Sequence, residues 1–203
     1  MASSTRNKAI ELWKAQLPEG DPQLLSKILF SFENPPGTKN VAGSQDALGI
    51  VMPCLNYHYY SQDNYWPSEI KSINDDSILD WLENHIYLIP LDPRGKNYDV
   101  LANTNISENG AKNLADAANK CWDAILNKDL NAFGTSFLDS FHAQIAMFPN
   151  MLDESIKPII HKYASKCIGY KLSGAGGGGY LILIAEKPIE NAIQIKIRRK
   201  NLK

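Results

Sequence analysis

Apolar side chains recur every three or four residues along much of the chain, a spacing that predicts amphipathic helices. The clearest stripe comprises Leu114, Ala117, Cys121 and Ile125 within residues 108–128. Prolines, glycines and polar runs separate the periodic segments and mark their ends. We predict helices over residues 6–17, 22–32, 97–104, 108–128, 129–147 and 152–164, and a short helix or turn over residues 77–83.

Short runs of branched aliphatic and aromatic residues predict strands between these helices. Residues 41–49 fit neither class, because they are too polar for a buried helix and too apolar for a linker. The order of the elements favours an α+β fold, in which helices cover one face of an antiparallel sheet. The predicted strands cover residues 50–55, 56–60, 66–73, 85–91, 180–185 and 192–198, with one more just before residue 173.

The composition is that of an ordinary globular protein, with 44% apolar and 21% charged residues among 203. A net charge of −1 gives no electrostatic basis for binding nucleic acid or an anionic membrane. Cys54, Cys121 and Cys167 have no paired spacing, which favours reduced thiols in a cytoplasmic protein. The histidines form no zinc pattern, and no segment has the length of a membrane span or a secretory signal.

The densest local signal is a run of five glycines in the six positions from Gly174 to Gly179, directly before a predicted strand. Glycine loses much entropy on folding, so a cluster usually marks backbone that approaches a ligand, such as a phosphate, with its N–H groups. A flexible linker or a dinucleotide fingerprint is disfavoured, because a strand and not a helix follows. The nucleotide P-loop pattern is absent, whereas a purely structural turn packed on its own sheet stays open.

The stretch from Leu172 to Gly179 resembles the third signature of the GHMP kinases, the family of galactokinase, homoserine kinase, mevalonate kinase and phosphomevalonate kinase. In that family this loop lies between two strands, near the phosphates and the acceptor. The resemblance implies a remnant of the N-terminal catalytic domain (residues 1–83) followed by a ferredoxin-like C-terminal domain (residues 84–203). It also implies contacts to ATP phosphates from Ser173, Gly174, Ala175, Gly176, Gly177, Gly178 and Gly179.

A second stretch, Gly43-Ser44-Gln45-Asp46 with a Met-Pro pair downstream, resembles the sugar-kinase branch of this family. Fucokinases and heptose kinases carry such a Gln-Asp pair, and fucokinases continue into a similar Met-Pro strand. The resemblance implies that Asp46 is the catalytic base and that Gly43, Ser44 and Gln45 contact the sugar. It argues against a mevalonate or homoserine acceptor. The residues alone leave open that Asp46 only caps a turn.

The loop after the strand at residues 85–91 contains two basic residues, Arg94 and Lys96, and resembles a fucokinase segment at the same place. Both side chains could contact phosphate or sugar hydroxyls. The alternative, without any ligand contact, is a solvated basic turn that caps the next helix. Lys171 likewise could touch a nucleotide phosphate or face solvent at the end of its strand.

The start of the chain resembles the end of the family's second signature, where two serines precede a helix. Ser3 and Ser4 would match these serines, and the resemblance implies that Ser4 helps to hold Mg²⁺ and the phosphates. Because the preceding glycines are absent, we expect an N-terminally truncated chain that binds ATP weakly. We also expect an exposed apolar surface that leads to instability, to a homo-oligomer or to completion by a missing segment.

These observations predict an ATP- and Mg²⁺-dependent sugar kinase of the fucokinase or heptose-kinase type, whose partners are small molecules. The alternative is a catalytically inactive sugar-binding or interaction module. Turnover and binding assays would separate the two.

Overall fold

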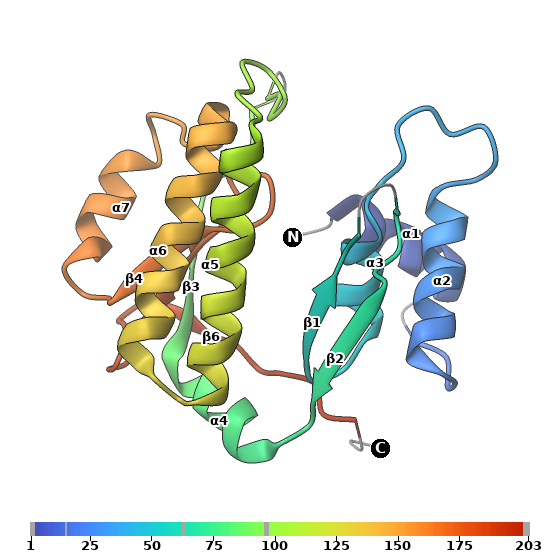
Figure 1. The fold of residues 1–203 in the computed structure, drawn as a ribbon, viewed down its shortest axis with the longest axis horizontal. Helices are drawn as coiled ribbons and strands as arrows, with labels where there is room; N and C mark the ends of the chain where they lie inside the picture. Colours follow the sequence, from blue (N-terminus) through green and yellow to red (C-terminus); the bar gives the residue numbers. More distant parts are fainter. Residues whose placement is uncertain (1–2, 15, 62–63, 96–97, 201–203) are drawn as a thin grey trace. The chain divides into compact units, whose positions relative to one another are not determined.

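The computed structural model describes residues 3–14, 16–61, 64–95 and 98–200. The chain divides into two compact units, drawn in Figure 1. Unit 1 comprises Met1–Asn74 and Ile197–Lys203, and unit 2 comprises Asp75–Lys196. The boundary implied by the family resemblance lies after residue 83 instead. The two differ because helix α4 (Asp76–His85) leads without a break into the first strand of unit 2 and contacts that unit's helices.

The described part of unit 1 consists of helices followed by an antiparallel hairpin. Helix α2 begins where predicted, because Asp21 accepts a hydrogen bond from the Leu24 amide at 2.9 Å and Pro22 starts the first turn. The hairpin pairs Tyr57 with Lys71 at its centre. The elements are α1 (Ser3–Trp13), α2 (Pro22–Glu33), α3 (Ser44–Val51), β1 (Leu55–Tyr59) and β2 (Glu69–Ile73).

The core of unit 1 lies between its helices. Ala9 of α1, Leu25 and Leu29 of α2, and Ala47 and Val51 of α3 form one buried cluster. Burial of apolar surface contributes about 25 cal/mol for each Å², so this cluster supplies much of what holds the short helix α3 in place. The helix that carries the predicted catalytic residue is therefore fixed by α2.

Helix α3 corrects two predictions from the sequence. Residues 44–51 are helical and largely buried, although residues 41–49 were judged too polar for a buried helix. The polar residues occupy the first turn, whereas Ala47, Leu48 and Val51 share the buried side. The strand predicted for residues 50–55 starts only at Leu55, because α3 continues through Val51.

The outer face of α2 is apolar and exposed. Leu24, Ile28 and Phe32 follow one another at intervals of four residues and are 56%, 42% and 37% exposed. Such a stripe on one helix face is typical of a surface that another protein segment covers. The self-association expected from the sequence stays a prediction.

Unit 2 combines an antiparallel sheet with helices. The strand order in the described residues is β4-β5-β3-β6, and all neighbouring strands are antiparallel. Figure 1 shows α5 and α6 side by side, and α6 packs on β4. Besides α4, the elements are β3 (Ile86–Pro90), α5 (Glu108–Leu126), α6 (Leu130–Met147), the 3-10 helix η1 (Pro149–Met151), α7 (Lys157–Ala164), β4 (Gly169–Leu172), β5 (Tyr180–Ile184) and β6 (Ile193–Gln194).

Cross-strand pairing places the hydrophobic core of unit 2 directly below the glycine run. Leu181 of β5 lies opposite Ile89 on one side and Leu172 on the other, and all three are buried. Phe141 of α6 and Ile160 of α7 belong to the same cluster. The strands that enter and leave the glycine run are therefore anchored by packing, which lets the loop between them adopt an unusual backbone.

Helix α6 approaches β4 so closely that both elements require glycine. A methyl group on Gly169 would lie 2.0 Å from the carbonyl oxygen of Gly134, and one on Gly134 would lie 2.5 Å from Ile168. No side chain fits at such distances. The contact fixes the strand that leads into the glycine run.

Several predicted bounds in unit 2 were wrong. Residues 98–104 contain a turn at residues 100–103 instead of a helix, and short polar residues such as Asn103, with φ +57°, favour this. Helix α7 begins at Lys157 and not near residue 152, because Pro158 stands in its first turn. The last strand shrinks to Ile193–Gln194, since only these residues pair with β3. The helix predicted over residues 108–128 is confirmed as α5.

Candidate functional site

The glycine loop, residues 174–179, joins β4 to β5 with a backbone that only glycine adopts readily. The φ angles are +57° at Gly174, +68° at Gly176, +63° at Gly177, +154° at Gly178 and +84° at Gly179. Side chains of L-residues rarely occupy this region. The loop conformation, more than flexibility, therefore explains why the sequence concentrates glycine here.

Close packing adds a second reason for the glycines in the middle of the loop. A methyl group on Gly176 would lie 2.6 Å from the carbonyl oxygen of Met151, and one on Gly177 would lie 2.1 Å from the Tyr98 ring. Gly178 similarly packs on the carbonyl of Asp92. The structural turn that the sequence left open therefore accounts for these positions whether or not a ligand binds.

Ser173 closes the base of the loop. Its amide donates to the Tyr180 carbonyl at 2.9 Å, and its buried hydroxyl accepts from the Tyr180 amide at 3.1 Å. Next to this base, the Leu91 amide donates a hydrogen bond to the Gly179 carbonyl at 2.9 Å. Ser173, predicted as a phosphate contact, thus holds the two strands together at the mouth of the loop.

The segment after β3 packs on the glycine loop through two side chains. Arg94 donates from Nε to the Gly176 carbonyl at 2.8 Å, and the Tyr98 hydroxyl donates to the Ala175 carbonyl. The Arg94 guanidinium also lies 5.3 Å from the centre of the Tyr98 ring. Burial raises the pKa of Tyr98, so its hydroxyl stays a donor at neutral pH.

Several amides of the loop remain free of internal acceptors. The Gly177 amide donates to Met151 at 2.9 Å. Within the described ranges, the amides of Gly174, Ala175 and Gly178 donate to no backbone or side-chain oxygen, although Gly178 is a buried residue. Consecutive amides without acceptors form the kind of concavity that binds anionic groups.

A cavity of about 570 Å³ opens beside this loop. Three carboxylates and the Tyr98 ring give it an acidic, partly aromatic wall. Ser155 lowers the pKa of Asp153 by hydrogen bonding, so this carboxylate is charged at neutral pH. Carboxylates accept hydrogen bonds from hydroxyl groups but repel phosphates. The lining residues are Gly95, Tyr98, Asp99, Pro149, Asn150, Leu152, Asp153, Glu154 and Gly177.

Asp46, the predicted catalytic residue, lies in the first turn of α3 in unit 1. Gly43 is the N-cap, and no side chain caps the helix, so Asp46 does not act as the cap. Its carboxyl group is half-buried and forms no hydrogen bond to any described residue. Burial raises its pKa, which makes the carboxylate a stronger proton acceptor than an exposed aspartate.

The neighbours of Asp46 differ in how accessible they are. Gln45 and Gly43 are exposed, whereas Ser44 has no exposed surface. The Ser44 hydroxyl lies 3.0 Å from the Tyr60 hydroxyl and also donates to the Tyr65 carbonyl. Ser44 therefore fixes the first turn of α3 from inside, an arrangement that residue spacing alone does not reveal.

The remaining candidates fall into different surroundings. Ser3 and Ser4 start helix α1, where Ser4 is exposed; the side chain of Ser3 and all of Lys96 lie outside the described residues. Lys171 follows neither prediction, because its ammonium donates to the Ser140 hydroxyl of α6 at 2.6 Å. Burial lowers the pKa of Lys171.

Asp46 belongs to unit 1, whereas Arg94 and the glycine loop belong to unit 2. Among the described residues, no cluster of three or more histidine, cysteine, aspartate or glutamate side chains could hold a metal ion. In the same ranges, every helix is too short or too polar to cross a membrane.

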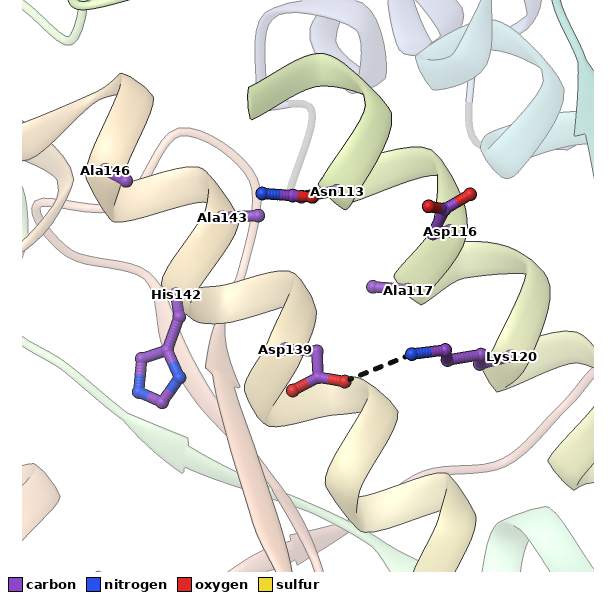
Figure 2. Close-up of a pocket in the computed structure, with 8 residues that line it drawn as sticks. All are labelled: Asn113, Asp116, Ala117, Lys120, Asp139, His142, Ala143 and Ala146. Atoms are coloured by element: carbon purple, nitrogen blue, oxygen red, sulfur yellow. Dashed lines mark ion pairs between the residues drawn. The ribbon is translucent and has the colours of Figure 1, made fainter. Parts of the chain in front are cut away.

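A second cavity of about 370 Å³ lies between α5 and α6 (Figure 2). Lys120 of α5 faces Asp139 of α6 across it at 4.0 Å, and both are well exposed. His142 points away from this pair in Figure 2. Exposed ion pairs of this kind contribute about 0–1 kcal/mol to stability.

Comparison with known proteins gives structural matches only. No protein-family model matches the sequence, and no curated protein is similar enough to match. Among solved structures, a mevalonate kinase matches with TM-score 0.58 and 19% identity, over 88% of this chain and 53% of its own. The chain is structurally similar to part of a GHMP kinase.

Two further structures extend this GHMP-like match. A Campylobacter jejuni protein assigned as a sugar kinase gives TM-score 0.56 and 19% identity, over 91% of this chain and 52% of its own. A D-glycero-D-manno-heptose 1-phosphate kinase from Bacteroides thetaiotaomicron gives TM-score 0.56 and 14% identity, over 94% of this chain and 56% of its own. At such identities the likeness concerns the fold, and the chain spans about half the length of each protein.

Proposed function

We propose that the chain is part of a GHMP-type sugar kinase, which transfers the γ-phosphoryl group of ATP to a hydroxyl group of a monosaccharide. In this proposal unit 1 corresponds to a portion of the N-terminal catalytic domain. Unit 2 corresponds to the ferredoxin-like C-terminal domain, in keeping with its strand order β4-β5-β3-β6. The boundary would then lie after Asn74.

The observation that carries the proposal is the set of loop amides without internal acceptors. Gly174, Ala175 and Gly178 present N–H groups that the described residues leave unpaired. Phosphate oxygens are acceptors of suitable charge for such a loop. Arg94 adds a guanidinium whose terminal nitrogens form no hydrogen bond to the described residues. These groups suit the phosphates of ATP.

Asp46 would act on the acceptor. Its carboxylate would take the proton from the sugar hydroxyl as the hydroxyl oxygen bonds to the γ-phosphorus and the bond to ADP breaks. The raised pKa supports this role, because a base with a pKa closer to neutrality holds the proton better. Exposed Gln45 would hydrogen-bond the sugar, and exposed Gly43 would contact it through its backbone.

Magnesium would be held mainly by phosphate oxygens. The exposed Ser4 hydroxyl is the protein group that fits such an ion best among the predicted residues, in agreement with the few protein ligands that Mg²⁺ usually takes. When bound, the ion would neutralise charge on the transferred phosphoryl group. The described part of the chain offers no carboxylate cage that would suit calcium or zinc instead.

The decisive experiment measures ADP release with Mg-ATP and a panel of fucose, galactose and heptoses. We expect sugar-dependent ADP that is lost in Asp46→Asn and retained in Asp116→Asn, which changes an exposed carboxyl on α5. Because burial raises the pKa of Asp46, the rate should fall on acidification at a pH above its ordinary value of 3.8. Full activity in Asp46→Asn would contradict its role.

An inactive sugar-binding or interaction module is the second candidate, because the chain spans about half the length of the kinases that it matches. Thermal protection by a sugar without ADP release would favour this module. Protection by neither ATP nor any sugar would contradict the kinase and the sugar-binding module, and would leave only the interaction module.

A further inference from the structure

The carbonyl groups of the glycine loop are held from one side by the segment that follows β3. Tyr98 donates to the carbonyl of Ala175, and Arg94 donates to the next carbonyl, that of Gly176. Rotating a peptide plane moves its carbonyl and its neighbouring amide in opposite directions. The Ala175 carbonyl shares its plane with the Gly176 amide, and the Gly176 carbonyl shares its plane with the Gly177 amide; these two amides donate to the carbonyls of Ser173 and Met151. Arg94 and Tyr98 therefore fix two peptide planes in the middle of the loop, and the unpaired amides of Ala175 and Gly178 lie in the planes directly before and after them.

The two side chains are also fixed to each other. The guanidinium of Arg94 lies 5.3 Å from the ring centre of Tyr98, and the same ring packs where a side chain on Gly177 would stand. Gly178 lies against the backbone of Asp92 and Arg94. The clamp, defined as Arg94 together with Tyr98, thus contacts the loop through hydrogen bonds, an aromatic face and backbone packing.

We propose that Arg94 and Tyr98 are positioning residues, which hold the glycine loop with its amides arranged for an anion and so set its affinity for phosphate. The proposal rests on the proposed function and assigns Arg94 a role different from a simple ligand contact. One guanidinium N–H serves the loop, while the others remain for the anion. Tyr98 acts only through the loop, because its hydroxyl is engaged with Ala175.

Four proteins test the clamp: the wild type, Tyr98→Phe, Arg94→Lys and the matched control Tyr87→Phe. Tyr98→Phe keeps the ring beside Gly177 and removes only the hydroxyl. Tyr87→Phe removes an equivalent bond, from a buried tyrosine hydroxyl to the Asn84 carbonyl at 2.7 Å, away from the loop. Thermal unfolding of the two Tyr→Phe variants reports how much stability each one loses.

The first readout is ligand-independent. Amide NMR signals of the loop glycines should shift or broaden in Tyr98→Phe and Arg94→Lys but not in Tyr87→Phe. The second readout is the dissociation constant of ATP and of inorganic pyrophosphate by calorimetry. We expect binding to weaken about fivefold to tenfold in each clamp variant, the effect of one lost hydrogen bond, and to be unchanged in Tyr87→Phe.

The two readouts separate this proposal from the proposed function. If the wild type binds neither ligand, the proposed function fails, and with it the role in phosphate affinity; altered glycine signals in the clamp variants would then still support the positioning of the loop. If the clamp variants keep wild-type glycine signals and wild-type affinity, the positioning role proposed for Arg94 and Tyr98 is wrong. Equal weakening in Tyr87→Phe would mean that lost stability, and not positioning, reduces binding.

Discussion

At the scale of single residues, Lys171 shows how far burial changes what a charged group does. Its position before the glycine loop suggested a phosphate ligand, yet its ammonium lies against α6 and bonds Ser140. Burial lowers its pKa, because the charged form loses hydration in the protein interior. A charge held in this way by one neutral hydroxyl tends to destabilise the folded state.

We therefore expect Lys171→Met to raise the free energy of unfolding at pH 7, by about 1 kcal/mol. The folded pKa lies below the unfolded one, so the unfolded chain binds more protons. The penalty is complete below the lowered pKa and disappears as the pH rises past the ordinary value of 10.5. The stability gain of the variant should shrink accordingly between pH 7 and pH 10, measured by urea unfolding.

Lys187→Met, at an exposed position of unit 2, is the control and should leave stability nearly unchanged at both pH values. A loss of stability in Lys171→Met beyond that of the control would show instead that the bond to Ser140 is net stabilising.

At the scale of elements, the contact between α6 and β4 decides where the glycine loop begins. Gly169→Ala would drive a methyl group into the Gly134 carbonyl, at 2.0 Å. Because backbone atoms cannot move aside without shifting the whole helix, we expect a loss of about 3 kcal/mol or more in urea unfolding. Gly95→Ala, where nothing lies within 4 Å, should cost much less. Equal stability of the two variants would rule out the close approach.

Sequence patterns predicted an element well where the apolar repeat extends over many residues. They failed where the element is short or where a tertiary contact determines the role of a residue. The apolar stripe of α5 was sufficient to predict it, because nineteen residues repeat the pattern. Helix α3 was missed because it is only eight residues long, and its first turn is polar. Gly134 and Gly169 looked like ordinary glycines, since only the crossing of α6 over β4 gives them a role.

The same division applies to the candidate site. The glycine loop could be selected from its density of glycines, whereas Asp46 was selected from the resemblance of its stretch to the sugar-kinase branch. The partners of the loop could not, because Arg94 and Tyr98 reach it from about eighty positions away in sequence. Arg94 was selected as a candidate contact to phosphate or sugar, but its sequence position did not indicate that it bonds the glycine loop.

At the scale of the whole molecule, the two units do not follow the chain in simple order. Residues 197–203 belong to unit 1, although the sequence analysis assigned them to the C-terminal domain. The Cys54 amide donates to the Arg198 carbonyl at 2.8 Å, and the Arg198 guanidinium donates to the carbonyls of Ile50 and Val51. Arg198 thus donates hydrogen bonds to carbonyls at the C-terminal end of α3, the helix that bears Asp46.

We expect Arg198→Ala to destabilise unit 1 by about 1 kcal/mol, because carbonyls at a helix C-terminus lose a cationic donor. Amide hydrogen exchange should speed up in α3 and not in the sheet of unit 2. Lys200→Ala, which removes an exposed charge nearby, should leave exchange in α3 unaltered. Faster exchange in unit 2 and an unchanged α3 would show that the arginine serves the other unit.

The return of the chain to unit 1 has a consequence for biosynthesis. A ribosome releases residues 75–196 as one uninterrupted stretch, so unit 2 can complete its contacts as soon as that stretch emerges. The segment Met1–Asn74 precedes that stretch, but the hydrogen bonds from Arg198 to the end of α3 can form only after the stretch has been translated. Unit 1 therefore receives this contact to α3 only after every residue of unit 2 has been translated.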